Sequence, residues 1–439
     1  MAATTGNDAP VRVEPPGARS GVRPRSLSVP RGSLRAVDLH VGDDERRARL
    51  VARHRLAPHT RTDDVTAIAD DLVALHSTDP VTVYLSAAAR MVTPSLAPVD
   101  AALYDDRVLL RHHAMRRTLW VFGHEHAALA HHGATSGVAA VQYRNLMGQV
   151  GAAGVADPAA WYADAAARVL AVLAERGPTT AREVGAALPD LAAQQLPIQG
   201  GSHPAHSRVL LVLGFEGRVL RARPTGTWIN GQYRWATAGS WVPGGIGPAP
   251  VPDGDDGSGG ARAAAAGLAR AYLRAFGPVT RDDLRWWAGW TVATTRAALA
   301  DTGAVEVGLD GGATGYLLPD DLGPVGDPGP SVALLPGLDP TTMGWKARGH
   351  YLSGDDAALL FDRNGNGGPA IWVDGRIAGT WVQRRDGTIA TRLFPGAHDR
   401  PGVEDDVAAA AERHRAVLGD VRFSVRYPAP VQPELLAGA

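Results

Sequence analysis

The sequence contains no cysteine, which excludes disulfides, thiolate zinc sites, iron–sulfur clusters and a cysteine nucleophile. It also lacks any run of about 20 apolar residues, so we expect no membrane-spanning segment. The N-terminal segment is polar and proline-rich without the apolar core of a signal peptide, so a cytoplasmic location is expected. With 439 residues, the chain is long enough for about three domains of ordinary size.

Lysine is nearly absent as well, because Lys346 is the one lysine among 44 basic residues. Arginine usage this strong is typical of a GC-rich genome, and the functional alternative is phosphate recognition by the planar guanidinium. Residues 1–37 contain six arginines against Asp8 and Glu14, a balance of +4, which leaves −5 for the rest of a chain with net charge −1. A uniformly basic nucleic-acid binder is therefore not indicated, whereas a local basic surface is.

The N-terminal half begins with a segment rich in Pro, Gly, Ser and Arg, residues 1–42, that predicts a disordered tail. Apolar spacing then predicts a helix from Thr62 to Leu75 that Pro80 stops. A helix over 98–104 and strands over 107–111 and 118–122 follow. The segment Leu75-His76-Ser77-Thr78-Asp79-Pro80 therefore stands at a helix end, where such residues are common in turns.

One order of elements occurs twice: helix, Gly-Pro-x-Thr, two helices and two strands. The two copies are marked by Gly177-Pro178-Thr179-Thr180 and Gly277-Pro278-Val279-Thr280. In each copy the segment from the last threonine, Thr180 to Glu183 and Thr280 to Asp283, predicts a cap for the next helix. This order predicts tandem winged helices, each a helix-turn-helix with a β-hairpin wing. From residue 331 the chain becomes rich in strands, with hairpin turns at Asp374-Gly375 and Asp386-Gly387, a helix over 403–418 and a last strand over 421–427.

The hairpin over 218–235 carries the most informative group of side chains: Arg221, Arg223, Thr227, Trp228, Asn230, Gln232, Tyr233 and Arg234. An ordinary sheet would bury the aromatic rings and direct the arginines outward. A wing in a DNA groove would use the same residues, with arginines on phosphates and amides on base edges. Composition leaves the two interpretations about equal.

Metal sites are not favoured by either of two candidate patterns. The segment from Asp362 to Gly367 matches the first half of a calcium loop, but Val373 stands where the loop needs a glutamate, so a glycine-rich turn is favoured. A group of histidines near the start of a predicted helix is more typical of a solvated face than of a zinc site: His124, His126, His131 and His132. We expect neither metal nor cofactor.

Six segments in order resemble a known family: LVALHSTDP, ALYDDRVLLRHHAMRRTLWVF, LGFEGRVLRARPTGTWINGQYRWA, YLRAFGPVTRDDLRWWAGW, LLPGLDPTTMGWKARGHYL and WVDGRIAGTWVQRRDG. They are similar to the bacterial winged-helix DNA glycosylases of the AlkZ-like family, over residues 43–427. The resemblance implies an α+β fold of tandem winged helices with a C-terminal β-barrel. The domains would be a tail (1–42), a first winged helix with the catalytic motif (43–158), a second with the DNA-probing hairpin (159–242), a linker (243–260), a third winged helix (261–330) and the barrel (331–439).

The resemblance implies excision of N7-alkylguanine from double-stranded DNA and unhooking of crosslinks, by a protein we expect to be monomeric. The family's catalytic motif is usually Gln-x-Gln or Gln-x-Asp, and here His76 and Thr78 replace its two ends. The histidine variant resembles family members that give self-resistance to DNA-alkylating natural products. His76 would act as a general base or orient a water, and Thr78 would hold that water or a phosphate.

The remaining site residues follow from the same resemblance. Asp79 would stabilise the sugar cation or orient His76, unless it only ends the helix. Arg116 and Arg117, where the family often has Arg-Gly, would contact phosphate, as would Arg348, for which an ion pair with Asp339 is an equal alternative. The hairpin residues would probe the minor groove. A bulky adduct would stay largely in the duplex rather than flip into a tight pocket.

A bifunctional glycosylase needs an amine nucleophile. Lys346 lies far along the chain from the motif, which favours a monofunctional, hydrolytic enzyme. The alternative to an enzyme is a non-catalytic winged-helix DNA-binding protein, a regulator or adduct sensor, because most winged helices regulate rather than catalyse. A metallohydrolase using the grouped histidines is the third class considered.

Overall fold

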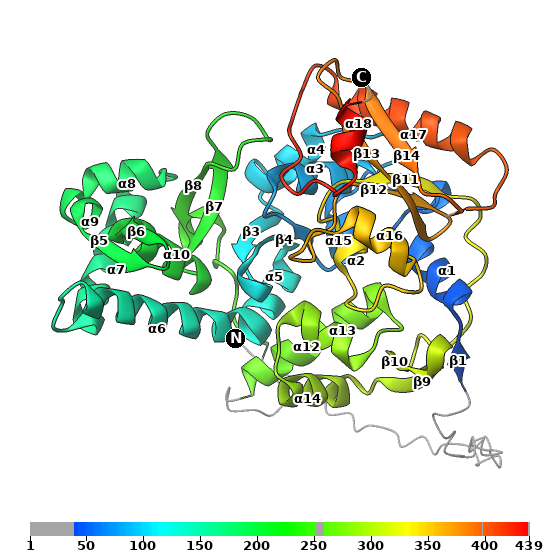
Figure 1. The fold of residues 1–439 in the computed structure, drawn as a ribbon. Helices are drawn as coiled ribbons and strands as arrows, with labels where there is room; N and C mark the ends of the chain where they lie inside the picture. Colours follow the sequence, from blue (N-terminus) through cyan, green and yellow to red (C-terminus); the bar gives the residue numbers. More distant parts are fainter. Residues whose placement is uncertain (1–38, 251–258, 397, 438–439) are drawn as a thin grey trace, which may run out of the picture. The chain divides into compact units, whose positions relative to one another are not determined.

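Four open β-sheets occur in the part of the chain that this computed structural model describes, residues 39–250, 259–396 and 398–437 (Figure 1). Helices are interspersed among the strands throughout, which confirms the predicted α+β class. Of the tail predicted to be disordered over 1–42, residues 1–38 lie outside the described residues, as does the middle of the predicted linker, 251–258. The prediction is wrong for the end of the tail, because His40–Val41 forms a strand. No described helix has the length and apolar character that crossing a bilayer would require.

The largest sheet has five antiparallel strands in the order β2-β4-β3-β7-β8. Its strands are β2 (Leu75–His76), β3 (Leu109–His113), β4 (Leu119–Gly123), β7 (Val219–Pro224) and β8 (Tyr233–Thr237). Strands β3 and β4 are buried along their whole length, which explains why their sequences do not alternate with polar residues. The sheet takes strands from both sides of residue 158, where the first two domains were expected to meet; the domain limits stay predictions.

The helices before residue 158 are α1 (Asp43–Arg53), α2 (Val65–Asp71), α3 (Pro80–Ala88), α4 (Ala97–Tyr104), α5 (His124–Ala130) and α6 (Ser136–Ala152). The prediction of a helix up to Leu75 is wrong at its end. Helix α2 stops at Asp71, and Val73 adopts a left-handed φ of 64° that a helix cannot continue through. Leu75 and His76 instead pair with Val121 and Trp120 of β4, and Pro80 begins α3 rather than ending a helix.

A second core lies among the elements that follow: α7 (Pro158–Arg176), α8 (Ala181–Ala187), α9 (Pro189–Ala193), β5 (Gln195–Ile198), β6 (Gly201–Pro204) and α10 (Ala205–Phe215). The predicted cap before α8 is present, since Thr180 and Glu183 form a reciprocal capping box. A short helix α11 (Ala238–Trp241) follows β8.

After the linker, the elements follow the predicted order with α12 (Gly260–Phe276), α13 (Arg281–Ala288), α14 (Val292–Thr302), β9 (Val305–Leu309) and β10 (Thr314–Leu317). Thr280 and Asp283 form the second capping box. The strand β1 (His40–Val41) adds to this hairpin in parallel with β9. The assignment of winged helices stays an interpretation of this order.

The C-terminal strands form an open sheet rather than the predicted barrel. They are β11 (Val332–Leu335), β12 (Ala370–Val373), β13 (Arg376–Gln383) and β14 (Ile389–Leu393), and β11 and β14 do not pair. Helix α17 (Val403–Leu418) shares an apolar core with this sheet, so packing by a helix replaces closure. The strand predicted over 421–427 is absent. Short helices α15 (Pro340–Met343), α16 (Gly354–Leu360) and α18 (Gln432–Ala437) complete this part.

Candidate functional site

A polar cavity of about 290 Å³ opens beside the end of β2, the first strand of the five-stranded sheet. Residues from widely separated parts of the sequence line it: His76, Thr78, Arg116, Thr118, Trp286, Leu338, Met343, Lys346, Arg348, Asn364, Gly365, Asn366 and Tyr427. Four of the residues expected from the sequence meet here, namely His76, Thr78, Arg116 and Arg348. We refer to this space as the His76 cavity.

His76 is held by the sheet and is only 3% exposed. It pairs with Trp120 across the β2–β4 ladder, and its ring meets the indole edge-on at 4.7 Å between centroids. Burial, and secondarily the charge of Arg116, lowers the pKa of His76 to about 3, so the ring is neutral at pH 7. The backbone N–H of Thr78 donates to its Nδ1 at 3.4 Å, an assignment that leaves the ring proton on Nε2.

Thr78 brings an unsatisfied hydroxyl to the same cavity. Its Oγ1 is buried and has no hydrogen-bond partner among the described residues, which is uncommon for a buried polar group and indicates a place for a water or a ligand. The Thr78 carbonyl accepts from Arg426 Nη1 at 3.1 Å. That contact fixes the backbone and leaves the hydroxyl free.

Ser77, between the two, is held by a buried arginine of β3. Arg111 Nε donates to Ser77 Oγ at 2.7 Å, its Nη1 donates to the Tyr104 hydroxyl, and its guanidinium lies 4.4 Å from the Tyr233 ring centroid. Arg111 is 1% exposed. The hairpin residue Tyr233 thus supports the strand that presents His76.

Asp79 does not line the cavity. It is the N-cap of α3, where its Oδ1 accepts from the backbone N–H of Val81 at 3.2 Å. Burial raises the pKa of the Asp79 carboxyl above its ordinary value. Of the roles considered for it, the helix-end role is the one that its observed contacts support.

Three cationic side chains line the cavity and have no acidic partner in the described part of the chain. Arg116 lies 4.2 Å from the Trp286 ring centroid, and Arg348 lies 4.1 Å from the Phe361 centroid. Neither arginine nor Lys346 forms a salt bridge with a carboxylate in the described residues, and Nε of each arginine is buried without a partner. Burial, then the charge of Arg348, lowers the pKa of Arg116. Uncompensated cations around a polar cavity attract an anion such as phosphate.

The alternative of an ion pair between Asp339 and Arg348 is wrong. Asp339 instead pairs with Arg90, with two N–H···O bonds of 2.8 and 2.9 Å, and both residues are fully buried. Despite its burial, the Arg90 guanidinium holds the pKa of Asp339 below its ordinary value. Ser86 and the backbone N–H of Thr341 also donate to this carboxylate, so it joins α3 to the segment that carries Leu338 and Met343.

The hairpin residues are largely occupied within the protein. Arg221 lies 3.4 Å from the Trp235 centroid, Arg223 pairs with Asp100 and Asp105, and Arg234 donates to the Pro224 carbonyl. Among the other hairpin residues, Trp228 packs on Tyr84, Asn230 forms a hydrogen bond within the loop and Tyr233 is buried. Of this group of side chains, only Thr227 and Gln232 are exposed. These contacts favour the ordinary-sheet interpretation for the strands and leave the loop tip open.

Arg117 lies at a different hollow of about 860 Å³, with α12 and α14 among its walls. Arg116 and Arg117 both have left-handed backbone angles, φ of 53° and 62°, which cost non-glycine residues of the order of 1 kcal/mol each. A glycine would adopt the backbone conformation of Arg117 without this cost, which explains why the resembled family often has glycine there. Keeping Arg116 in that conformation places its guanidinium over Trp286.

Several residues of the His76 cavity were missed by sequence reasoning: Thr118, Trp286, Lys346, Asn364 and Asn366. The turn predicted at Asp362 is present, since Asp362 accepts from the backbone N–H groups of Asn364 and Asn366. The signal that could have identified Trp286 is its place beside Trp287, because only one of two adjacent helix residues can face the core.

The grouped histidines have separate partners. His124 contacts the Arg107 carbonyl, His126 lies 3.4 Å from Asp70, His131 faces His112 and His132 contacts the Gly247 carbonyl. Within the described ranges, no three His, Asp or Glu side chains are grouped so that they could hold a metal ion.

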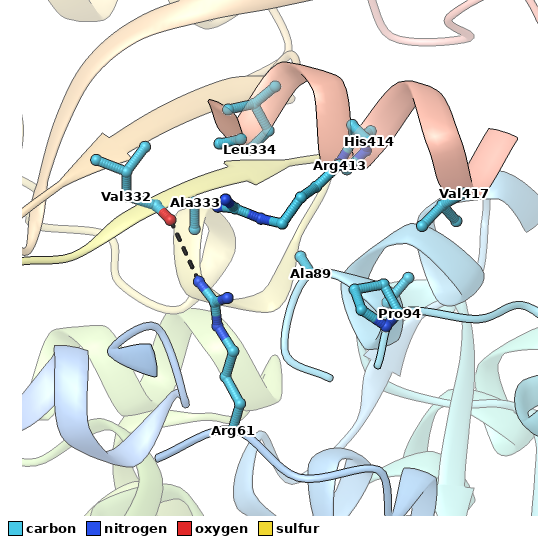
Figure 2. Close-up of a pocket in the computed structure, with 11 residues that line it drawn as sticks. Arg61, Ala89, Pro94, Val332, Ala333, Leu334, Arg413, His414 and Val417 are labelled. Atoms are coloured by element: carbon cyan, nitrogen blue, oxygen red, sulfur yellow. Dashed lines mark hydrogen bonds between the residues drawn. The ribbon is translucent and has the colours of Figure 1, made fainter. Parts of the chain in front are cut away.

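A smaller cavity of about 30 Å³ lies between α17, β11 and the loops around residues 61 and 94. Figure 2 shows the side chains of Arg61, Arg413 and His414 around it, with Arg61 reaching the Val332 carbonyl. It holds none of the expected site residues, and its volume suits about a single water. The His76 cavity, which four of the expected residues line, is the candidate functional site.

Comparison with known proteins agrees with the family resemblance. The family model described as DNA glycosylase AlkZ-like matches residues 69–417. Among solved structures, the DNA glycosylase AlkZ of Streptomyces sahachiroi is similar with a TM-score of 0.66 at 19% identity, over 89% of this chain and 99% of that one. At that identity the likeness shows the fold. No curated protein matches the sequence.

Proposed function

The chain belongs to the AlkZ-like DNA glycosylase family, and on that premise we propose that it hydrolyses the N-glycosidic bond of N7-alkylguanine in double-stranded DNA at the His76 cavity. The observation that supports this proposal most strongly is that the expected catalytic and phosphate-binding residues lie together. His76 and Thr78, at the positions of the family's catalytic motif, share one cavity with Arg116 and Arg348.

The chemistry needs little acid catalysis. N7-alkylguanine is already cationic and leaves readily, so the positive charge that develops on the sugar is what the site must accommodate. A histidine with a pKa near 3 adds no charge beside that sugar. Its Nε2–H donates to the oxygen of a water, and the Thr78 hydroxyl accepts a hydrogen of the same water. His76 therefore orients the nucleophile rather than deprotonating it, and the proton leaves to solvent after attack on the C1′ cation.

Arg116 and Arg348 bind the phosphates on either side of the reacting nucleotide. Their charges are then balanced by the DNA, and the sugar between them faces His76. The loop tip with Thr227 and Gln232 is the part of the hairpin that remains free to contact a groove. These assignments account for the absence, among the described residues, of acidic partners for the cations around the cavity.

The size of the cavity supports substrates whose adduct stays outside it. About 290 Å³ is at the lower limit for a ligand pocket, which suits a sugar-phosphate rather than a guanine with a bulky substituent. We propose that bulky natural-product adducts and crosslinks are therefore accepted as well as small ones, as expected of a self-resistance enzyme. Base release itself is hydrolytic, with water as the nucleophile, as expected from the sequence.

The test is base release from duplexes carrying N7-methylguanine or a bulky intercalating N7 adduct. We expect release by the wild type, at least tenfold slower release by Thr78→Val and His76→Ala, and retained release of methylguanine by His76→Gln, which restores the family's amide. His203→Ala is the matched control, because His203 is exposed on β6. Absence of release, with tight binding to unmodified duplex, would contradict the proposal and favour a regulator or adduct sensor.

A further inference from the structure

Lys346 lies far from the motif of His76 and Thr78 along the sequence, but it lies at the same cavity in the structure. Lys346 lines the same cavity as His76 and Thr78, although 268 residues separate it from Thr78 in the numbering. Its side chain is exposed to the cavity and has no acidic partner among the described residues. The amine that a lyase step requires is therefore present at the site.

The backbone at Lys346 is held firmly for an exposed residue. The N–H groups of Lys346 and Ala347 both donate to Oδ1 of Asp283 at 2.9 Å. Asp283 is fully buried, and its other oxygen closes the capping box of α13. Trp345, immediately before the lysine, is buried as well. Helix α13 thus fixes both the lysine's backbone and Trp286, and it presents them to one cavity.

The product of base release is the chemical partner for this amine. An abasic deoxyribose opens to an aldehyde at C1′, and a primary amine condenses with an aldehyde, whereas a guanidinium does not. The two arginines of the cavity are proposed to bind the flanking phosphates, so the ring-opened sugar between them stays within the space that Lys346 lines. This step rests on the proposed function for the supply of its substrate.

We propose that the chain has a second activity, an abasic-site lyase in which Lys346 is the catalytic residue. Its Nζ adds to C1′ of the aldehyde, water leaves, and a C=N bond joins protein to DNA. Loss of a C2′ proton to solvent then breaks the C3′–O bond, and the departing strand carries a 5′-phosphate. Water hydrolyses the remaining imine and returns the free amine.

Borohydride trapping tests this directly, because it reduces the imine to a stable amine bond. The probe is a duplex with a preformed abasic site, made from a uracil-containing duplex, so no alkylated base is needed. Wild-type chain is expected to give a covalent protein–DNA complex and a nicked strand. Lys346→Ala and Lys346→Arg should both lose at least 90% of the complex, although Lys346→Arg keeps the positive charge.

The scarcity of lysine makes the attachment site easy to assign. Lys346 is the one lysine of the sequence, so its ε-amine and the N-terminal α-amino group are the two candidates, and peptide mass spectrometry of the trapped complex distinguishes them. Attachment at residue 346 would support the proposal. Attachment at the N-terminus, undiminished trapping of Lys346→Arg, or wild-type binding to the abasic duplex without trapping would each overturn it.

Base release from the N7-methylguanine duplex is measured in parallel with the wild-type chain. Trapping at residue 346 without base release would refute the proposed function and leave the lyase standing. Base release without trapping would do the reverse.

Discussion

The buried ring of His76 predicts a rate of base release that does not follow an ordinary imidazole titration. Its pKa is lowered to about 3, so at pH 5 only about 1% of the ring would be protonated. An imidazole with the ordinary pKa of about 6.5 would be only about 3% neutral at that pH. If the neutral ring is required, the rate stays flat from about pH 8 to about pH 5, whereas an unperturbed ring would lower it about 30-fold.

The assay is single-turnover release of N7-methylguanine from duplex DNA across that range, after subtraction of spontaneous loss without protein. His76→Gln is the matched variant, because an amide cannot titrate there. Circular dichroism at each pH confirms that the chain stays folded, which matters because His54, His112 and His113 are also buried with lowered pKa values.

The two outcomes separate a ring that is neutral throughout this pH range from a ring that titrates within it. A flat wild-type profile fits a neutral residue that orients water. A fall of about 30-fold with a midpoint near pH 6.5, absent from His76→Gln, would refute the reasoning from burial. It would instead assign His76 as a general base that titrates in reach of solvent.

Three further outcomes follow from the contacts around the cavity. Asp339→Asn leaves Arg90 as an unpaired buried charge, so the free energy of unfolding, measured in urea, should fall by about 3–5 kcal/mol. A fall of under 1 kcal/mol would mean that the pair is solvated. Arg117→Gly relieves the strain of a left-handed backbone conformation, so the free energy of unfolding from thermal melting should rise by up to about 1 kcal/mol. A lower melting temperature would contradict the assigned strain. Arg116→Ala and Arg348→Ala should each remove about one phosphate contact, so the slope of the logarithm of the binding constant against the logarithm of the salt concentration should change by about 0.9. Unchanged slopes would mean that these arginines do not contact DNA phosphates.

Local patterns in the sequence predicted many elements of the fold. The capping boxes at Thr180 and Thr280, the turn at Asp374-Gly375 and most helices depend on neighbours within a few residues, so the sequence contains their cause. The end of α2, in contrast, does not depend on near neighbours alone. Leu75 continues the apolar spacing of a helix, but pairing with β4, more than 40 residues away, decides its conformation.

The site was predicted in part for the same reason. The family resemblance identified His76, Thr78, Arg116 and Arg348, which do meet in one cavity. It could not place Lys346 there, because separation along the chain says nothing about distance in a fold. The predicted barrel failed in a similar way. The strands around the two predicted hairpin turns are present, but the strand over 421–427 is absent, and α17 covers the apolar face that closure would have hidden.

The five-stranded sheet constrains how this protein can evolve. β2, which carries His76, and β8, at the base of the hairpin, are the two edges of one hydrogen-bonded unit. Recombination between related genes at residue 158 would separate β7 and β8 from the Arg111–Arg221 pairing that joins them to β3. We therefore expect the hairpin and the strand that carries His76 to be inherited together rather than exchanged as separate modules.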